Sequence, residues 1–170
     1  MTIIAYDGER VVSDNNIFKY GTRIQQARPY KVWSLHRSGG TQIKFVGAGT
    51  YSQLAVRADF LKRHIGQLDF SQRVVVPAMD TQMSWKLSFK DFDPYDALII
   101  VDKGEERRVY YVSPELVLIE VKAPYACGNE DMVLIAMGAM HAGASADAAV
   151  LIACELSGVG LVDDKSLSIL

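Results

Sequence analysis

The chain has 170 residues, of which 49% are hydrophobic and 22% are charged, and its formal net charge is −2. This length suits one domain, residues 1–170, with a substantial buried core. The small net charge gives little attraction to a nucleic-acid backbone or an anionic membrane surface. The sequence has neither an apolar run of the roughly 20 residues that span a bilayer nor the layout of a signal peptide at its start. We therefore expect a cytoplasmic protein without nucleic-acid or membrane partners.

The beginning of the chain has the alternating pattern of β-strands. Asp7-Gly8 is a strong hairpin turn between the first two of them. The predicted strands are residues 2–7, 10–14, 30–36 and 41–48. We expect these four strands to form one antiparallel sheet that begins at Thr2. The polar stretch 15–29 predicts an irregular or weakly stranded excursion between the two hairpins.

The pattern then changes to a helical period. Apolar residues recur at i, i+4, i+7 and i+11, which predicts an amphipathic helix over residues 50–66. They are Leu54, Ala58, Leu61 and Ile65. Thr50 is the expected N-cap, and Gly66 suits the C-terminal end.

A second helix is predicted over residues 79–90, with Met83 and Leu87 on its buried side. Later segments alternate between the two types of element. Strands are predicted over residues 97–101, 108–112, 116–121, 161–162 and 167–170, and helices over 129–143 and 145–156.

This element order predicts an α+β fold. Two antiparallel sheets packed face to face, with helices outside each, would bury the apolar face of every element. We therefore predict a four-layer α-β-β-α sandwich. The main rival is a parallel Rossmann-type sheet, but the hairpin turns at Asp7-Gly8 and Lys103-Gly104 argue against it, because parallel neighbours need long crossovers.

The cysteines and histidines do not suggest a cofactor. Cys127 and Cys154 lie in apolar surroundings without a CxxC or Cys/His spacing, which is typical of buried thiols. The three histidines of the chain are scattered, so neither a zinc site nor a Ser/His/Asp triad is predicted. We expect no metal and no cofactor.

Thr2 is the candidate nucleophile. It follows Met1 directly, and a small residue at this position often permits enzymatic removal of the initiator methionine. A threonine at a free N-terminus carries its own base, because its α-amino group has a pKa near neutrality and can take the hydroxyl proton through a water. Many chains begin Met-Thr without any catalytic role, so the interpretation depends on other residues.

Four landmarks occur together in an order typical of one family. They are the hairpin that starts Thr2-Ile3-Ile4-Ala5, the strand Tyr30-Lys31-Val32-Trp33-Ser34-Leu35, the strand end Phe45-Val46-Gly47-Ala48-Gly49-Thr50, and Tyr125-Ala126-Cys127-Gly128-Asn129 before a helix. In order and spacing, nearly the whole chain resembles the proteasome β-type subunits, which are N-terminal nucleophile (Ntn) hydrolases. It is nearer the short bacterial and phage-type homologues than the longer eukaryotic subunits.

The resemblance assigns catalytic roles to residues besides Thr2. Lys31 is the cation that lowers the pKa of the threonine amine and hydroxyl, and Asp14 holds that lysine. Gly47 gives a backbone N–H to the oxyanion. Asn129 stands where active members usually carry a serine that orients the threonine amine. By themselves these residues also fit a solvated lysine, a turn cap, a strand end and a helix cap.

The resemblance implies a threonine-type endopeptidase. Thr2 would attack peptide or unfolded-protein substrates inside a homo-oligomeric ring, with an ATP-dependent unfoldase as a further partner. One alternative is a catalytically silent, ring-forming scaffold that retains Met1. Another is hydrolysis of a small-molecule amide, although relatives with that activity often use cysteine or serine at the N-terminus. A further aspartate that the family carries near its closing strand has no clear counterpart, since Glu155, Asp163 and Asp164 are imperfectly spaced.

Overall fold

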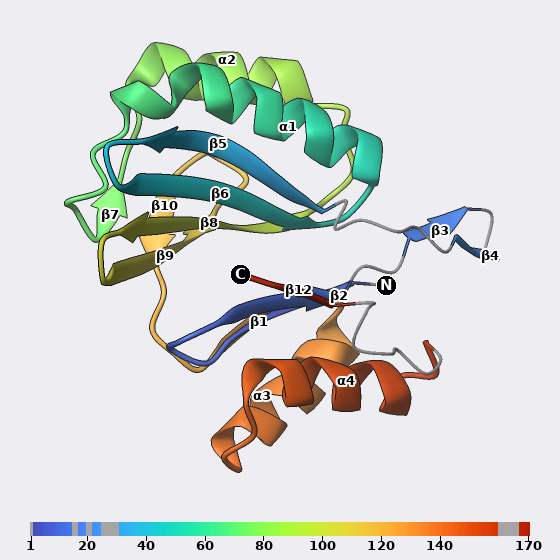
Figure 1. Cartoon of the computed structure of the whole chain (residues 1–170). Coiled ribbons are helices and arrows are strands. Elements are labelled where there is room, and N and C mark those ends of the chain that lie inside the picture. The colour runs from blue at the N-terminus through green and yellow to red at the C-terminus, as the bar shows by residue number, and fades with distance from the viewer. Residues whose placement is uncertain (1, 15–16, 20–21, 25–30, 160–166) are drawn as a thin grey trace. The chain divides into compact units, whose positions relative to one another are not determined.

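The structure is a computed structural model that describes residues 2–14, 17–19, 22–24, 31–159 and 167–170 (Figure 1). It divides into two compact units. The first comprises residues 1–31 and 122–170, and the second is the continuous segment 32–121. The first unit therefore combines the two ends of the chain, whereas the second is formed by its middle.

The first unit is built on a four-stranded antiparallel sheet with the order β11-β1-β2-β12. Its strands are β1 (Ile3–Tyr6), β2 (Val11–Asp14), β11 (Tyr125–Gly128) and β12 (Leu167–Ile169). The predicted hairpin pairs Ile4 with Ser13, and Ile3 pairs with Gly128 on the other side. The strand that follows Thr2 is therefore central in its sheet.

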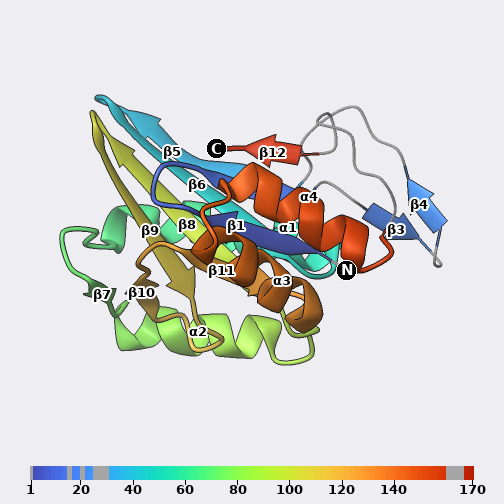
Figure 2. The same ribbon diagram turned by 90° about the horizontal axis from the view of Figure 1, so that it is seen from below.

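Two helices, α3 (Glu130–His141) and α4 (Ala146–Leu156), lie together on one face of this sheet (Figures 1 and 2). Alternate strand residues Ile3, Ala5 and Val12 face the helices and are fully buried. Small residues on the helices complete this core, which lets the backbones approach closely. They include Ala136, Ala146, Ala149 and Ala153. A separate two-stranded ribbon, β3 (Ile17–Lys19) and β4 (Thr22–Ile24), lies in the predicted excursion.

The second unit is built on a six-stranded antiparallel sheet with the order β5-β6-β8-β9-β10-β7. Its strands are β5 (Val32–Ser38), β6 (Thr41–Ala48), β7 (Val74–Val75), β8 (Asp96–Lys103), β9 (Glu106–Val112) and β10 (Leu118–Glu120). Helices α1 (Tyr51–His64) and α2 (Met79–Phe89) lie over one face, and a short 3₁₀ helix, η1 (Ile65–Gln67), follows α1 (Figure 1). The core between them is aromatic, with Phe45, Trp85 and Tyr110 fully or almost fully buried.

The predicted α+β class is confirmed, with two antiparallel sheets of four and six strands and four α-helices in the described part of the chain. The predicted grouping of strands is wrong. The first hairpin, β1-β2, and the next, β5-β6, belong to different sheets instead of one. The two strands of each hairpin are close in the sequence, but the strand that flanks the hairpin in its sheet is further along the chain. The flanking strand of β2 is β12, and that of β6 is β8.

Thr50 is the N-cap of α1 as predicted, but its side chain donates to the Asp93 carboxylate at 2.8 Å and makes no cap bond to the helix. Two other helix predictions need correction. Gly66 lies inside η1 and does not end α1. On α2, Met83 and Leu87 are 56% and 68% exposed. The buried residues of α2 are Thr81, Trp85 and Phe89, because the sheet face beneath them is filled by aromatic packing.

Candidate active site

The predicted nucleophile and the predicted lysine are in direct contact. Lys31 Nζ donates to Thr2 Oγ1 at 2.5 Å. Thr2 immediately precedes β1 and is 8% exposed, and Lys31 immediately precedes β5 and is 2% exposed. A buried lysine next to a threonine hydroxyl is not a solvated surface lysine, so the first of the alternative readings is wrong.

Asp14 completes a buried cluster with these two residues. Its Oδ2 atom lies 3.8 Å from Lys31 Nζ, and its Oδ1 atom accepts the backbone N–H of Ile3 at 2.8 Å. The carboxylate is fully buried at the end of β2. It therefore neutralises the lysine and also holds the residue that follows Thr2. Burying a single charge without such a partner would be costly.

Burial lowers the pKa of Lys31, and the nearby Asp14 carboxylate and Cys154 thiol partly oppose that change by favouring the charged form. A lysine with a lowered pKa gives up its proton more readily near neutral pH than an exposed one. Its ammonium form in turn favours ionisation of the Thr2 hydroxyl. Both effects suit a nucleophile that must lose a proton before it reacts.

The backbone of Thr2 is held from its other side by β11. The Asn129 N–H donates to the Thr2 carbonyl oxygen at 2.9 Å. Gly128 has φ +126°, and a Cβ at this position would collide with that same carbonyl oxygen. Gly128 is a positioning residue that the sequence reasoning missed, although a glycine directly before a helix N-cap was a visible signal.

The Asn129 side chain serves as a helix cap. Its Oδ1 atom accepts the N–H of Met132 at 3.4 Å, and Asn129 is the N-cap of α3. Glu130 and Asp131 follow in the first turn, where negative charge is favourable. The cap explains the residue without reference to the threonine amine, so its assignment as an orienting residue stays a prediction.

Gly47 lies on β6 in the second unit, where it pairs with Ala97. A Cβ on Gly47 would come within 2.6 Å of the Leu54 side chain, which is fully buried on α1. Packing against Leu54 therefore favours a glycine here independently of any catalytic need. Its role as the oxyanion donor stays a prediction.

The described residues contain no group of three or more His, Cys, Asp or Glu side chains arranged to hold a metal ion. Both cysteines of the chain are buried thiols and are not joined in a disulfide. In the described part of the chain, no helix is both long and apolar enough to cross a membrane.

No known protein-family profile matches the sequence, and a search of curated proteins also finds no match. Comparison with solved structures does find similar chains. An HslV from Trypanosoma brucei has a TM-score of 0.55 at 15% identity, over 100% of this chain and 98% of its own. Anbu (ancestral beta-subunit) from Yersinia bercovieri has a TM-score of 0.61 at 16% identity, over 99% of this chain and 79% of its own.

A third solved structure is the BPH of Thiobacillus denitrificans in complex with epoxomicin, with a TM-score of 0.54 at 17% identity, over 99% of this chain and 96% of its own. The chain has the proteasome-like Ntn-hydrolase fold. The resemblance predicted from four sequence landmarks is thereby confirmed for the fold. In this proteasome-like chain, the buried cluster of Thr2, Lys31 and Asp14 lies at the start of the sheet that β1 and β2 share with β11 and β12.

Proposed function

We propose that this chain is an N-terminal threonine peptidase of proteasome type, with Thr2 as the nucleophile. The observation that carries the proposal is the buried hydrogen bond between Lys31 Nζ and Thr2 Oγ1. A threonine hydroxyl ordinarily needs only water or a backbone partner. A buried lysine held by a buried carboxylate is costly to place there, and its effect on the hydroxyl pKa gives it a chemical use.

The proposed reaction begins with removal of Met1, which lies outside the described residues. The freed α-amino group of Thr2 takes the hydroxyl proton through a water while Oγ1 attacks the peptide carbonyl carbon. The C–N bond then breaks, and the leaving amine receives that proton. This leaves an ester on Thr2, which a water molecule hydrolyses to release the acid product and restore the hydroxyl.

Two groups stabilise the charges in this scheme. The Lys31 ammonium lies next to the oxygen that becomes negative as the hydroxyl loses its proton. The Gly47 N–H is the proposed donor to the oxyanion, and removal of such a donor costs about 2.7–4 kcal/mol in other hydrolases. One of the structurally similar proteins, BPH, is in complex with epoxomicin, and this similarity supports the proposal.

We further propose that the peptidase works inside a homo-oligomeric ring in the cytoplasm and receives peptides or unfolded proteins, with an ATP-dependent unfoldase as partner. Enclosure has a physical purpose, since an unspecific peptidase would otherwise degrade its folded neighbours. The similarity to HslV and Anbu supports this part of the proposal.

One observation favours a second function, that of a catalytically silent scaffold. The Asn129 side chain is engaged in capping α3, so it is committed to the helix at the position where active members carry their orienting serine. In this alternative Met1 is retained and Thr2 has no free amine.

The test is the intact mass of the purified protein before and after exposure to an epoxyketone. Loss of Met1 with an adduct on Thr2 is the expected result. Thr2→Ala is the matched control, because alanine also permits methionine removal but lacks the hydroxyl. Adduct formation by Thr2→Ala would identify another nucleophile, and a mass that keeps Met1 and gains nothing would support the scaffold.

A further inference from the structure

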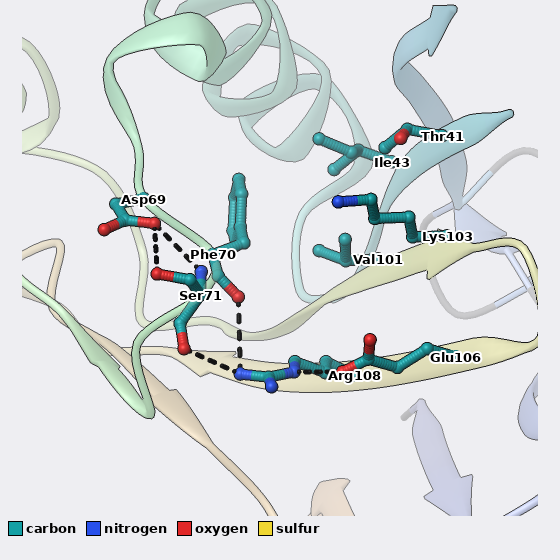
Figure 3. Close-up of a pocket in the computed structure, with 9 residues that line it drawn as sticks. All are labelled: Thr41, Ile43, Asp69, Phe70, Ser71, Val101, Lys103, Glu106 and Arg108. Carbon is teal, nitrogen blue, oxygen red and sulfur yellow. Dashed lines mark hydrogen bonds and ion pairs between the residues drawn. The ribbon is translucent and has the colours of Figure 1, made fainter. Parts of the chain in front are cut away.

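The second unit contains a pocket of about 340 Å³, within the size range of sites that bind small molecules. It lies on the face of the six-stranded sheet that carries Ile43 and Val101, which pair across β6 and β8 and form an apolar floor. Phe70 forms the opposite wall (Figure 3). All its lining residues belong to residues 41–108, so the pocket is formed within one unit.

The wall that carries Phe70 is fixed to the sheet. The Tyr110 hydroxyl lies 2.8 Å from the Phe70 carbonyl oxygen and 2.9 Å from that of Gln72. Arg108 donates to the carbonyl oxygen of Ser71 at 2.9 Å, and the Phe70 ring packs edge-on against Tyr110. The pocket is therefore preformed, which lowers the entropic cost of binding a ligand.

Two of the four charged residues around the pocket pair with each other. Arg108 Nε donates to the Glu106 carboxylate at 2.8 Å, and this bond raises the pKa of Arg108. The Asp69 carboxylate accepts both the backbone N–H and the hydroxyl of Ser71. These bonds hold the loop and the strand in place, and the Arg108 charge is neutralised by Glu106.

Lys103 is the cation of the pocket that no carboxylate in the described ranges neutralises. Its ammonium group has no ion pair or hydrogen bond to any residue that the structure describes. The side chain points across the pocket toward Phe70, above Val101 and below Ile43 (Figure 3). Thr41, its direct neighbour across β6 and β8, places a hydroxyl on the same rim. The pocket thus combines one available cation and one hydroxyl with an apolar interior.

We propose that this pocket binds a monocarboxylic acid with an apolar body. The carboxylate would accept from Lys103 and Thr41, and the body would lie between Phe70 and the floor of Ile43 and Val101. A single cation suits a monoanion, whereas a phosphate dianion would be matched by several. The apolar contact supplies affinity, and the charge supplies orientation. The proposal does not depend on catalysis by Thr2.

The experiment is a titration of the full-length protein with octanoate, followed by isothermal calorimetry and by amide shifts in NMR spectra. Octanol and acetate are the comparison probes, since one lacks the charge and the other the apolar body. We expect octanoate to bind at least about tenfold more tightly than either, with shifts concentrated at residues 41–43, 69–71 and 101–103. Equal binding of octanol, or no binding of octanoate, would overturn the proposal.

Two lysine variants make the test specific. Lys103→Gln should weaken octanoate binding about tenfold and leave the weaker octanol binding unchanged. Lys62→Gln, at an exposed lysine on α1, is the matched control and should bind as the parent does. Both side chains are exposed, so both variants should fold. Undiminished octanoate binding by Lys103→Gln would show that the pocket does not use this cation.

Discussion

Asp7 and Ala146 are 139 positions apart in the chain, yet the Asp7 carboxylate accepts the Ala146 backbone N–H at 2.8 Å. The other carboxylate oxygen accepts the N–H groups of Glu9 and Arg10. One side chain thus closes the β1-β2 turn and also caps α4, whose nominal N-cap Ser145 makes no side-chain bond. Sequence reasoning assigned Asp7 to the turn alone.

Asp7→Ala should lower the free energy of unfolding by about 1–2 kcal/mol, because a helix cap and two turn bonds are lost together. The measurement is urea unfolding followed by circular dichroism. Asp59→Ala is the control, since Asp59 is exposed and its carboxylate pairs with Arg63 at the surface. The control should stay within about 0.5 kcal/mol of the parent.

The same carboxylate predicts a pH dependence. Burial raises the pKa of Asp7, but the hydrogen bonds from Ala146, Arg10 and Glu9 outweigh it and hold the pKa below the ordinary 3.8. Its stabilising contribution is therefore complete above pH 3.8 and is lost as the pH falls through the folded-state pKa. The stability difference between the parent and Asp7→Asn should shrink over that interval. A difference that grows as the pH falls there would contradict the assignment.

Lys31→Met should abolish probe labelling of Thr2 and also destabilise the fold by about 3–5 kcal/mol, because the buried Asp14 carboxylate loses its cation. Adding Asp14→Asn removes that unpaired charge and keeps an acceptor for the Ile3 N–H. The double variant should regain much of the stability without regaining labelling. Recovery of both would show that Lys31 matters for folding alone.

Gly128→Ala should be much more damaging than Gly143→Ala. Both glycines have positive φ, +126° and +97°, so each substitution has a backbone cost of about 1–2 kcal/mol. Only at Gly128 does the added methyl group also meet the Thr2 carbonyl oxygen, whereas Gly143 faces open space. Thermal unfolding together with Thr2 labelling measures both effects. If both variants lost the same amount of thermal stability and labelling, the proposed close contact between Gly128 and the Thr2 carbonyl oxygen would be contradicted.

The exposed and buried faces of α2 give a further comparison. Trp85→Ala should cost about 3–5 kcal/mol, since the ring is 1% exposed and packs against Phe60 and Phe89. Leu87→Gln, on the 68% exposed side, should change the free energy of unfolding by less than about 0.5 kcal/mol. A large loss in the Leu87 variant measured on the monomer would contradict the orientation of this helix.

Local patterns in the sequence predicted most elements of this chain. The Asp7-Gly8 turn, the helical period from Leu54 to Leu61 and the acidic first turn of α3 each depend on neighbours a few residues away. Such patterns can be recognised from a few consecutive residues of the sequence. They do not specify which strand will flank a hairpin, so the separation of β1-β2 from β5-β6 was not predictable from them.

In the candidate site, too, some features were predictable from the sequence and the long-range contacts were not. Thr2, Lys31 and Asp14 were named from the resemblance, and the structure brings them together. The period of α2 does not distinguish its two faces, because Met83 and Leu87 are as apolar as the aromatic residues that are buried. The contact of Asp7 with Ala146 had no counterpart in any local pattern, whereas the position of Gly128 before a helix N-cap was visible but did not specify its contact with Thr2.

The two units differ in when they can be completed during synthesis. Residues 32–121 are continuous, so this unit can fold as soon as its last strand has left the ribosome. The unit that carries Thr2 needs β11 and β12 to pair with β1 and β2, and these contacts span more than a hundred residues. A nascent or truncated chain without β12 would leave one edge of β2 open. The sheet that follows Thr2 is therefore completed only after residues 167–169 have been made, more than a hundred residues after the strand that they join.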